Sequence, residues 1–76
     1  MELHDAKAFG IAVREYREKQ GFSQIKIAAI ANTGVRFISD LENGKPNVQL
    51  DKALRVAKIL GMGIETPNIN TPNIEG

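Results

Sequence analysis

Polar side chains suited to binding a partner gather in two short stretches of this sequence, residues 23–24 and residues 35–45. An arginine, a hydroxyl and a carboxylate along one side of a short helix can hydrogen-bond to base edges in the major groove of DNA. A serine and a glutamine at the start of the preceding helix lie where backbone N–H groups and the positive end of the helix dipole can meet a phosphate. The candidate DNA-binding residues are Ser23, Gln24, Val35, Arg36, Ser39, Asp40, Asn43 and Lys45.

Three residues of the second stretch are expected to make different kinds of contact. We expect Arg36 to contact a guanine through two hydrogen bonds, because it lies near the N-terminus of the second short helix, where residues face base edges. Val35 either touches a thymine methyl group or shields the turn, and the sequence does not separate these two possibilities. Phe37 is interpreted as a packing residue against the preceding helix.

The residue types needed for catalysis are scarce. The single histidine, His4, comes before the first expected helix and has no acid or nucleophile placed to assist it. Both serines have roles in the binding pattern, and the segment 61–63 (Gly-Met-Gly) lacks the strand and the further glycines of a phosphate loop. With no cysteine and one histidine, the sequence predicts no enzyme, no metal site and no cofactor.

The elements that must position these residues are helices, because apolar residues recur at steps of three and four. Asp5 is placed to cap the first helix and Gly21 to end it, and the other three are expected at 24–31, 35–43 and about 49–60. Gly10 inside the first helix costs up to about 1 kcal/mol relative to alanine, which predicts a neighbour packed closely against it.

Each of the last three helices has an apolar face that we expect to point into the core. Ile25 and Ile30 lie off this face of the second helix; single exposed apolar residues are normal, but two on one short helix also fit a protein partner. The inward residues expected are Ile27, Ala28, Ala31, Ile38, Leu41, Leu50, Leu54, Ala57 and Leu60.

Length and composition limit the chain to one small domain of 76 residues. Surface scaling gives burial of only about 60% of the unfolded surface, so the helices must pack efficiently or a second chain must contribute. The longest apolar run, near 59–64, is too short to span a bilayer, and the N-terminus lacks the layout of a signal peptide. We therefore expect a cytoplasmic chain that does not bind a membrane.

Charge is distributed unevenly along the chain, although the net charge is only +1. Residues 14–58 contain nine Lys or Arg against five Asp or Glu, which leaves +4 in the middle and acidic ends. This distribution is compatible with a polyanionic partner, and a solvated helix surface explains it about equally well.

Six short segments resemble the Xre/Cro/lambda-repressor-like helix-turn-helix family: 21–24 (Gly-Phe-Ser-Gln), 27–28, 31–32, 38–39, 41–45 (Leu-Glu-Asn-Gly-Lys) and 50–51. The resemblance covers about residues 8–61 at fixed spacing. It implies an all-α bundle of four to five short helices, with the helix-turn-helix motif at about 23–42. It also implies double-stranded operator DNA as the ligand and a homodimer on a two-fold symmetric site.

The family pattern assigns roles to four further residues. It implies a structural ion pair between Arg17 and Glu42, although Arg17 by its type alone would suit DNA. The family usually has glycine where this chain has Asn32, so Asn32 must adopt a left-handed conformation. The family often has a serine or threonine cap where this chain has Gly34, so that cap lacks its side-chain hydrogen bond.

The runs 35–46 and 50–56 are most similar to HipB-type antitoxins. That similarity implies a transcriptional repressor that autoregulates its operon and is the antitoxin of a HipA-like kinase toxin. The alternatives are a stand-alone phage-type repressor or a restriction-modification controller protein. A further alternative, of another class, is a protein-interaction module that no longer binds DNA.

The C-terminal segment differs in kind from the rest of the chain. Residues 66–69 and 71–74 both read Thr-Pro-Asn-Ile, and two prolines so close favour an extended course over a helix. We therefore divide the chain into a helix-turn-helix domain, 1–62, and a tail, 63–76. The tail either binds a protein partner through Ile69 and Ile74 or is a frayed terminus.

Overall fold

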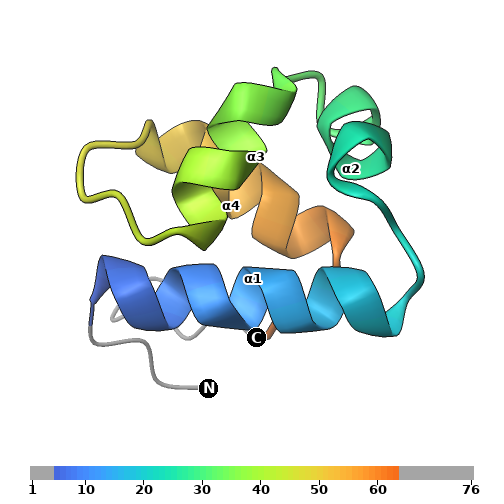
Figure 1. The fold of residues 1–76 in the computed structure, drawn as a ribbon, viewed down its shortest axis with the longest axis horizontal. Coiled ribbons are helices and arrows are strands. Elements are labelled where there is room, and N and C mark those ends of the chain that lie inside the picture. The colour runs from blue at the N-terminus through green and yellow to red at the C-terminus, as the bar shows by residue number, and fades with distance from the viewer. Residues whose placement is uncertain (1–4, 64–76) are drawn as a thin grey trace, which may run out of the picture.

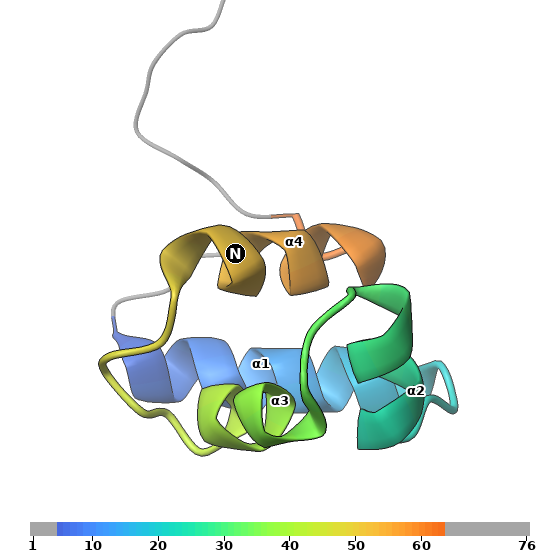
Figure 2. The same ribbon diagram turned by 90° about the horizontal axis from the view of Figure 1, so that it is seen from above.

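A computed structural model describes residues 5–63, and in this range the chain is a bundle of four α-helices with no strand. The helices are α1 (Ala6–Lys19), α2 (Gln24–Ile30), α3 (Val35–Glu42) and α4 (Leu50–Ile59). In Figure 1, α1 runs along the bottom, α2 and α3 lie above it, and α4 lies behind α3. Seen from above, α3 and α4 lie on opposite sides of α1 (Figure 2). The all-α bundle of short helices expected from the sequence is confirmed.

Predictions about the chain ends fall outside the described residues. These are the extended course of the tail, the contacts of Ile69 and Ile74, and the surroundings of His4.

The helix ends follow the cap residues. Asp5 accepts a hydrogen bond from the backbone N–H of Ala8 at 2.8 Å, and Gly21 takes a φ of +78° after α1. The last three helices are each slightly shorter than expected, because residues 31, 43, 49 and 60 serve as caps rather than as helical residues.

The core is built from all four helices. Val13, Ile27, Ile38 and Val56, one from each helix, are the largest side chains that are fully buried. Burying such a side chain is worth roughly 1.5–3 kcal/mol, so these four hold the bundle together. Half-buried aromatic residues, Phe9, Tyr16, Phe22 and Phe37, pack around this centre.

The predicted inward face of α4 is wrong for two leucines. Leu50 is 69% exposed and Leu54 40% exposed, whereas Ala53 and Val56 are buried together with Ala57 and Leu60 as expected. Two alanines on the inward face let α4 approach the other helices closely. The sequence analysis assigned Leu50 and Leu54 to the inward face, whereas the smaller Ala53 occupies it in the structure.

Gly10 has the close neighbour that its place in a helix predicted. A Cβ atom added at Gly10 would lie 2.4 Å from the carbonyl oxygen of Leu41 and 2.8 Å from that of Glu42. Backbone atoms of α3 therefore lie directly against α1 at this point. The glycine sets the distance between α1 and α3, and so the placement of α3 on the molecule.

Candidate DNA-binding surface

The turn between α2 and α3 depends on Asn32, which takes a φ of +57°. Asparagine adopts the left-handed conformation more readily than most residues, so the glycine that the family usually has at this position is not required here. The backbone N–H of Thr33 then bonds to the carbonyl of Ala28 at 2.9 Å and closes the turn. Gly34 is the N-cap of α3 and provides no side-chain hydrogen bond, as the sequence predicted.

Two buried side chains hold α3 on the bundle. Ile38 is fully buried and Leu41 nearly so, and α3 packs against both α1 and α2. The opposite side of α3 is left toward solvent. Its exposed residues include Val35 and Arg36, both in the first turn.

Arg36 is almost fully open to solvent, with 88% of its side chain exposed. Its Nε lies 3.8 Å from a carboxylate oxygen of Asp40, one turn further along α3. An exposed pair of this kind contributes little to stability, so Arg36 can exchange Asp40 for another acceptor at small cost. Asp40 is half-buried on the same face.

Ser39, Asn43 and Lys45 continue the candidate surface beyond the first turn of α3. The Asn43 side-chain amide donates to the Ser39 hydroxyl at 3.5 Å, and Ser39 is half-buried. Lys45 is exposed in the loop that follows α3, where its ammonium can reach an acidic ligand.

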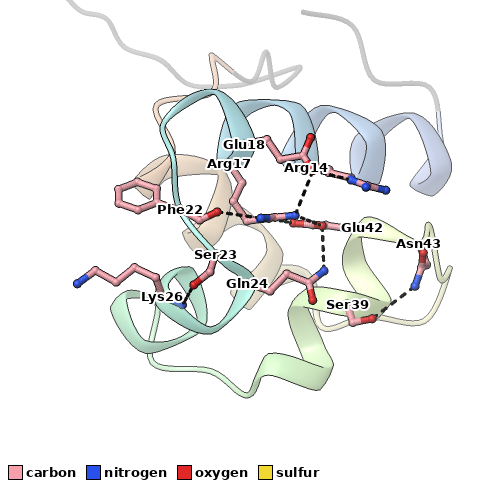
Figure 3. A network of polar contacts seen from close by, with 10 residues as sticks. All are labelled: Arg14, Arg17, Glu18, Phe22, Ser23, Gln24, Lys26, Ser39, Glu42 and Asn43. Carbon is pink, nitrogen blue, oxygen red and sulfur yellow. Dashed lines mark hydrogen bonds and ion pairs between the residues drawn. The ribbon is translucent and has the colours of Figure 1, made fainter.

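The start of α2 has a different geometry from α3. The Ser23 hydroxyl accepts a hydrogen bond from the backbone N–H of Lys26 at 3.0 Å, so Ser23 is the N-cap of α2. Gln24 is half-buried, and its Nε2 donates to Glu42 Oε1 at 3.1 Å (Figure 3). The sequence did not predict this contact, because nothing in the spacing of Gln24 and Glu42 shows that the two ends of the motif meet.

Arg17 and Glu42 form a buried ion pair beneath this surface. Arg17 Nε donates to Glu42 Oε2 at 2.6 Å and Nη2 donates to Oε1 at 3.0 Å, while Nη1 donates to the carbonyl of Phe22 at 2.8 Å. The two side chains are 9% and 4% exposed. Hydrogen bonding to Glu42 raises the pKa of the Arg17 guanidinium above its ordinary value, despite burial, which acts the other way.

Two basic residues of α4 were not among the candidates. Arg55 Nη1 donates to the carbonyl of Ala31 at 2.9 Å and so satisfies the end of α2. The Lys52 ammonium lies 6.0 Å from the centre of the Phe37 ring, in reach of a cation–π contact. Both bring positive charge to the flank of α4 that faces α2 and α3. No spacing in the sequence predicted either of these contacts.

Residues 5–63 contain no group of three acidic or histidine side chains that could hold a metal ion. No helix in the same range is long and apolar enough to cross a membrane.

The geometry is that of a helix-turn-helix unit, with α2 and α3 at an angle around a tight turn and α3 exposed. A helix-turn-helix family model matches residues 13–66 of the sequence. This chain belongs to the helix-turn-helix family. The family resemblance stated from the sequence is therefore confirmed. Helix-turn-helix regulators of this Xre-like type are DNA-binding transcription regulators, not enzymes.

Two relatives extend the comparison. The uncharacterised HTH-type transcriptional regulator y4mF of Sinorhizobium fredii is 45% identical over 56 residues, which cover 74% of each chain. The control protein C.BamHI of Bacillus amyloliquefaciens is 40% identical over 55 residues, which cover 71% of this chain and 68% of that protein.

Solved structures of HipB share the helix-turn-helix fold of this chain. HipB in a complex with an O4 20mer matches with a TM-score of 0.78 and 17% identity, over 92% of this chain and 99% of HipB. A HipA–HipB–O2–O3 complex matches equally well. At this identity the similarity shows the fold.

Proposed function

We propose that this helix-turn-helix regulator is a sequence-specific repressor that reads an operator with α3. The observation that supports this best is the exposed Arg36 side chain on the outer face of a helix that Ile38 and Leu41 hold in place. A short helix fixed on one side and open on the other fits the major groove, with its N-terminal residues over base edges.

The proposed contacts divide into base reading and phosphate binding. Arg36 donates to a guanine, and Val35 touches a thymine methyl group. Ser39 and Asp40 hydrogen-bond to base edges further along the groove. The phosphate-binding residues are Ser23, Gln24, Asn43 and Lys45, which fix the position of the protein on the duplex.

Replacing Arg36 with alanine is expected to relax the preference at one base position in each half-site, at a cost of about 1–3 kcal/mol in operator binding. Competition binding against a set of operators with single base changes measures this. Lys19→Ala removes the same charge at the end of α1, away from α3, and is the matched control. If Arg36→Ala keeps the full discrimination of the wild type, α3 is not the base-reading helix.

The proposal includes a homodimer on a two-fold symmetric operator, because one recognition helix covers only a few base pairs. On α4, Lys52 and Arg55 lie on the flank toward α2 and α3, and helical geometry puts Leu50 and Leu54 on the other flank. A symmetric contact through these exposed leucines leaves α3 open for DNA. We therefore propose that the dimer interface consists of these leucines, the C-terminal end of α4 and residues 61–64.

The double change Leu50→Ser with Leu54→Ser is expected to raise the dimer dissociation constant at least about tenfold, with little effect on folding of the monomer. Sedimentation equilibrium of the full chain measures the constant. Ile25→Ser removes an exposed isoleucine from α2 and is the control for loss of apolar surface. An unchanged dissociation constant in the double variant places the dimer contact elsewhere.

The proposed cellular role has two candidates, both cytoplasmic DNA-binding regulators, of which the first represses its own operon. The first is the antitoxin of a HipA-like kinase, supported by the HipB-like runs 35–46 and 50–56 and by HipB structures that share the fold. The second is a restriction-modification controller, supported by the 40% identity with the control protein C.BamHI.

Co-expression with the product of the neighbouring gene separates these two roles. A kinase that co-purifies with the chain, and whose activity the chain blocks, supports the antitoxin. A neighbouring endonuclease or methyltransferase that does not co-purify supports the controller.

Within the antitoxin role we propose that residues 1–62 bind DNA and residues 63–76 bind the kinase or the second subunit through Ile69 and Ile74. Truncation after Glu65 tests that division in the same experiment.

A further inference from the structure

The buried carboxylate of Glu42 contacts more than its ionic partner. Glu42 Oε1 accepts hydrogen bonds from both Arg17 Nη2, at 3.0 Å, and Gln24 Nε2, at 3.1 Å (Figure 3). Arg17 belongs to α1, Gln24 is the first residue of α2, and Glu42 is the last residue of α3. The Glu42 carboxylate, at the end of α3, therefore contacts both the first residue of α2 and an arginine of α1.

We propose that Glu42 is a positioning residue for DNA binding, which holds the side-chain amide of Gln24 in one orientation for contact with a phosphate. This proposal rests on the operator-binding function proposed above. It assigns a second role to the carboxylate of a structural ion pair.

The orientation follows from the donors and acceptors involved. The terminal torsion of a glutamine side chain is broad and roughly two-fold, so a solvated amide exchanges its oxygen and nitrogen positions freely. The carboxylate that Arg17 binds offers only acceptors, so the Gln24 nitrogen must face it and the oxygen must turn away. Arg17 in turn is fixed by its bonds to Glu42 and to the Phe22 carbonyl.

The fixed amide still has a donor for a ligand. One N–H of Gln24 Nε2 is used by Glu42, and the described part of the chain gives the second N–H no partner. The neighbouring Ser23 hydroxyl accepts from Lys26 N–H, which leaves its own proton to donate. Phosphate oxygens accept hydrogen bonds from side chains of this kind, so both donors suit a DNA phosphate. Ordering the amide before DNA arrives removes part of the entropy cost of the contact.

A double-mutant cycle on DNA binding tests the proposal. The four full-length proteins are the wild type, Gln24→Met, Glu42→Asp and the double variant, and the probe is a DNA fragment from the promoter of this chain's own gene. Glu42→Asp keeps the charge for Arg17 but is one methylene too short to reach both partners. Gln24→Met keeps the stem and removes the amide. Circular dichroism selects a temperature at which all four are folded.

Gln24→Met is expected to weaken binding about tenfold, because a hydrogen bond to a charged group is lost. Glu42→Asp is expected to weaken binding several-fold when Gln24 is present and less than about twofold in the Gln24→Met background. Gln20→Met is the matched control for loss of an amide: Gln20 lies at the end of α1, outside the proposed DNA contacts, and donates to the carbonyl of Leu60. Compared at protein concentrations at which both proteins are dimers, its DNA affinity should not change. Equal losses from Glu42→Asp in both backgrounds overturn the proposal.

A measurement on the wild type keeps the proposal testable if Glu42→Asp does not fold. Nitrogen-15 relaxation of the side-chain amides in the free protein should show Gln24 restrained and Gln49 mobile, because Gln49 makes no side-chain cap hydrogen bond. A Gln24 amide as mobile as that of Gln49 overturns the positioning role. Failure of the wild type to bind any promoter DNA overturns instead the proposed function on which it rests.

Discussion

Replacing Glu42 with alanine is expected to lower the free energy of unfolding by about 3 kcal/mol or more, because it leaves a buried guanidinium without its counter-charge. Arg17 is 9% exposed and donates two hydrogen bonds to Glu42, and the Gln24 amide loses the same acceptor. Urea denaturation followed by circular dichroism measures the loss.

A compensating variant shows how much of the stability loss comes from the unpaired buried charge and how much from lost packing. Arg17→Met with Glu42→Leu removes both charges and keeps similar volume, so it should recover much of the stability lost in Glu42→Ala. Arg14→Ala breaks the exposed pair with Glu18 and is the control, with an expected change below about 1 kcal/mol. A loss below about 0.5 kcal/mol in Glu42→Ala would mean that the pair behaves as an open surface pair.

Replacing Gly10 with alanine is expected to destabilise the protein by about 2 kcal/mol, although alanine is the better helix former. Helix propensity alone favours alanine by about 1 kcal/mol. The added Cβ would lie 2.4 Å from the Leu41 carbonyl oxygen and 2.8 Å from that of Glu42, so α3 must move away from α1. We expect this overpacking to cost about 3 kcal/mol, which exceeds the gain.

Thermal denaturation of Gly10→Ala checks this sign. The control is Gly34→Ser: a Cβ at Gly34 meets nothing within 4 Å, and serine is a good N-cap, so stability should rise by a few tenths of a kcal/mol. A stabilising Gly10→Ala would show that α1 and α3 are not in close contact.

Local signals in the sequence were enough to predict the helices and their turns. Asp5, Ser23 and Gly21 act at helix ends through their own backbone and side-chain chemistry, so the sequence shows them directly. Asn32 has the left-handed conformation that the family pattern requires, and Gly34 is an N-cap without a side-chain hydrogen bond, as expected.

The inward face of α4 could not be predicted from apolar spacing, since residues 50, 53, 54, 56, 57 and 60 are all apolar. Spacing does not say that Ala53 belongs inside and Leu50 outside, because that choice depends on how closely α4 approaches its neighbours. Leu50 and Leu54, which this close packing leaves exposed, belong to the proposed dimer interface.

The candidate site shows the same division between local and tertiary information. The exposure of Arg36 follows from its place on α3, opposite Ile38 and Leu41. The bond from Gln24 to Glu42 joins residues 18 apart, and the bond from Arg55 to the Ala31 carbonyl joins residues 24 apart. Such contacts exist only once the helices have packed, and no spacing rule points to them.

The central claim is that this chain binds its operator through phosphate and base contacts, and the salt dependence of DNA binding tests it most directly. The full chain is titrated into a DNA fragment from the promoter of its own gene, with a scrambled fragment as control. A dimer in which the two Lys45 side chains each neutralise a phosphate should lose at least about tenfold in affinity between about 50 and about 200 mM salt, because binding releases counterions. Tight promoter binding that falls steeply with salt and exceeds binding to the scrambled fragment is the predicted result. Affinity that does not change with salt, or no binding to the promoter, would contradict the claim and favour a protein-interaction module.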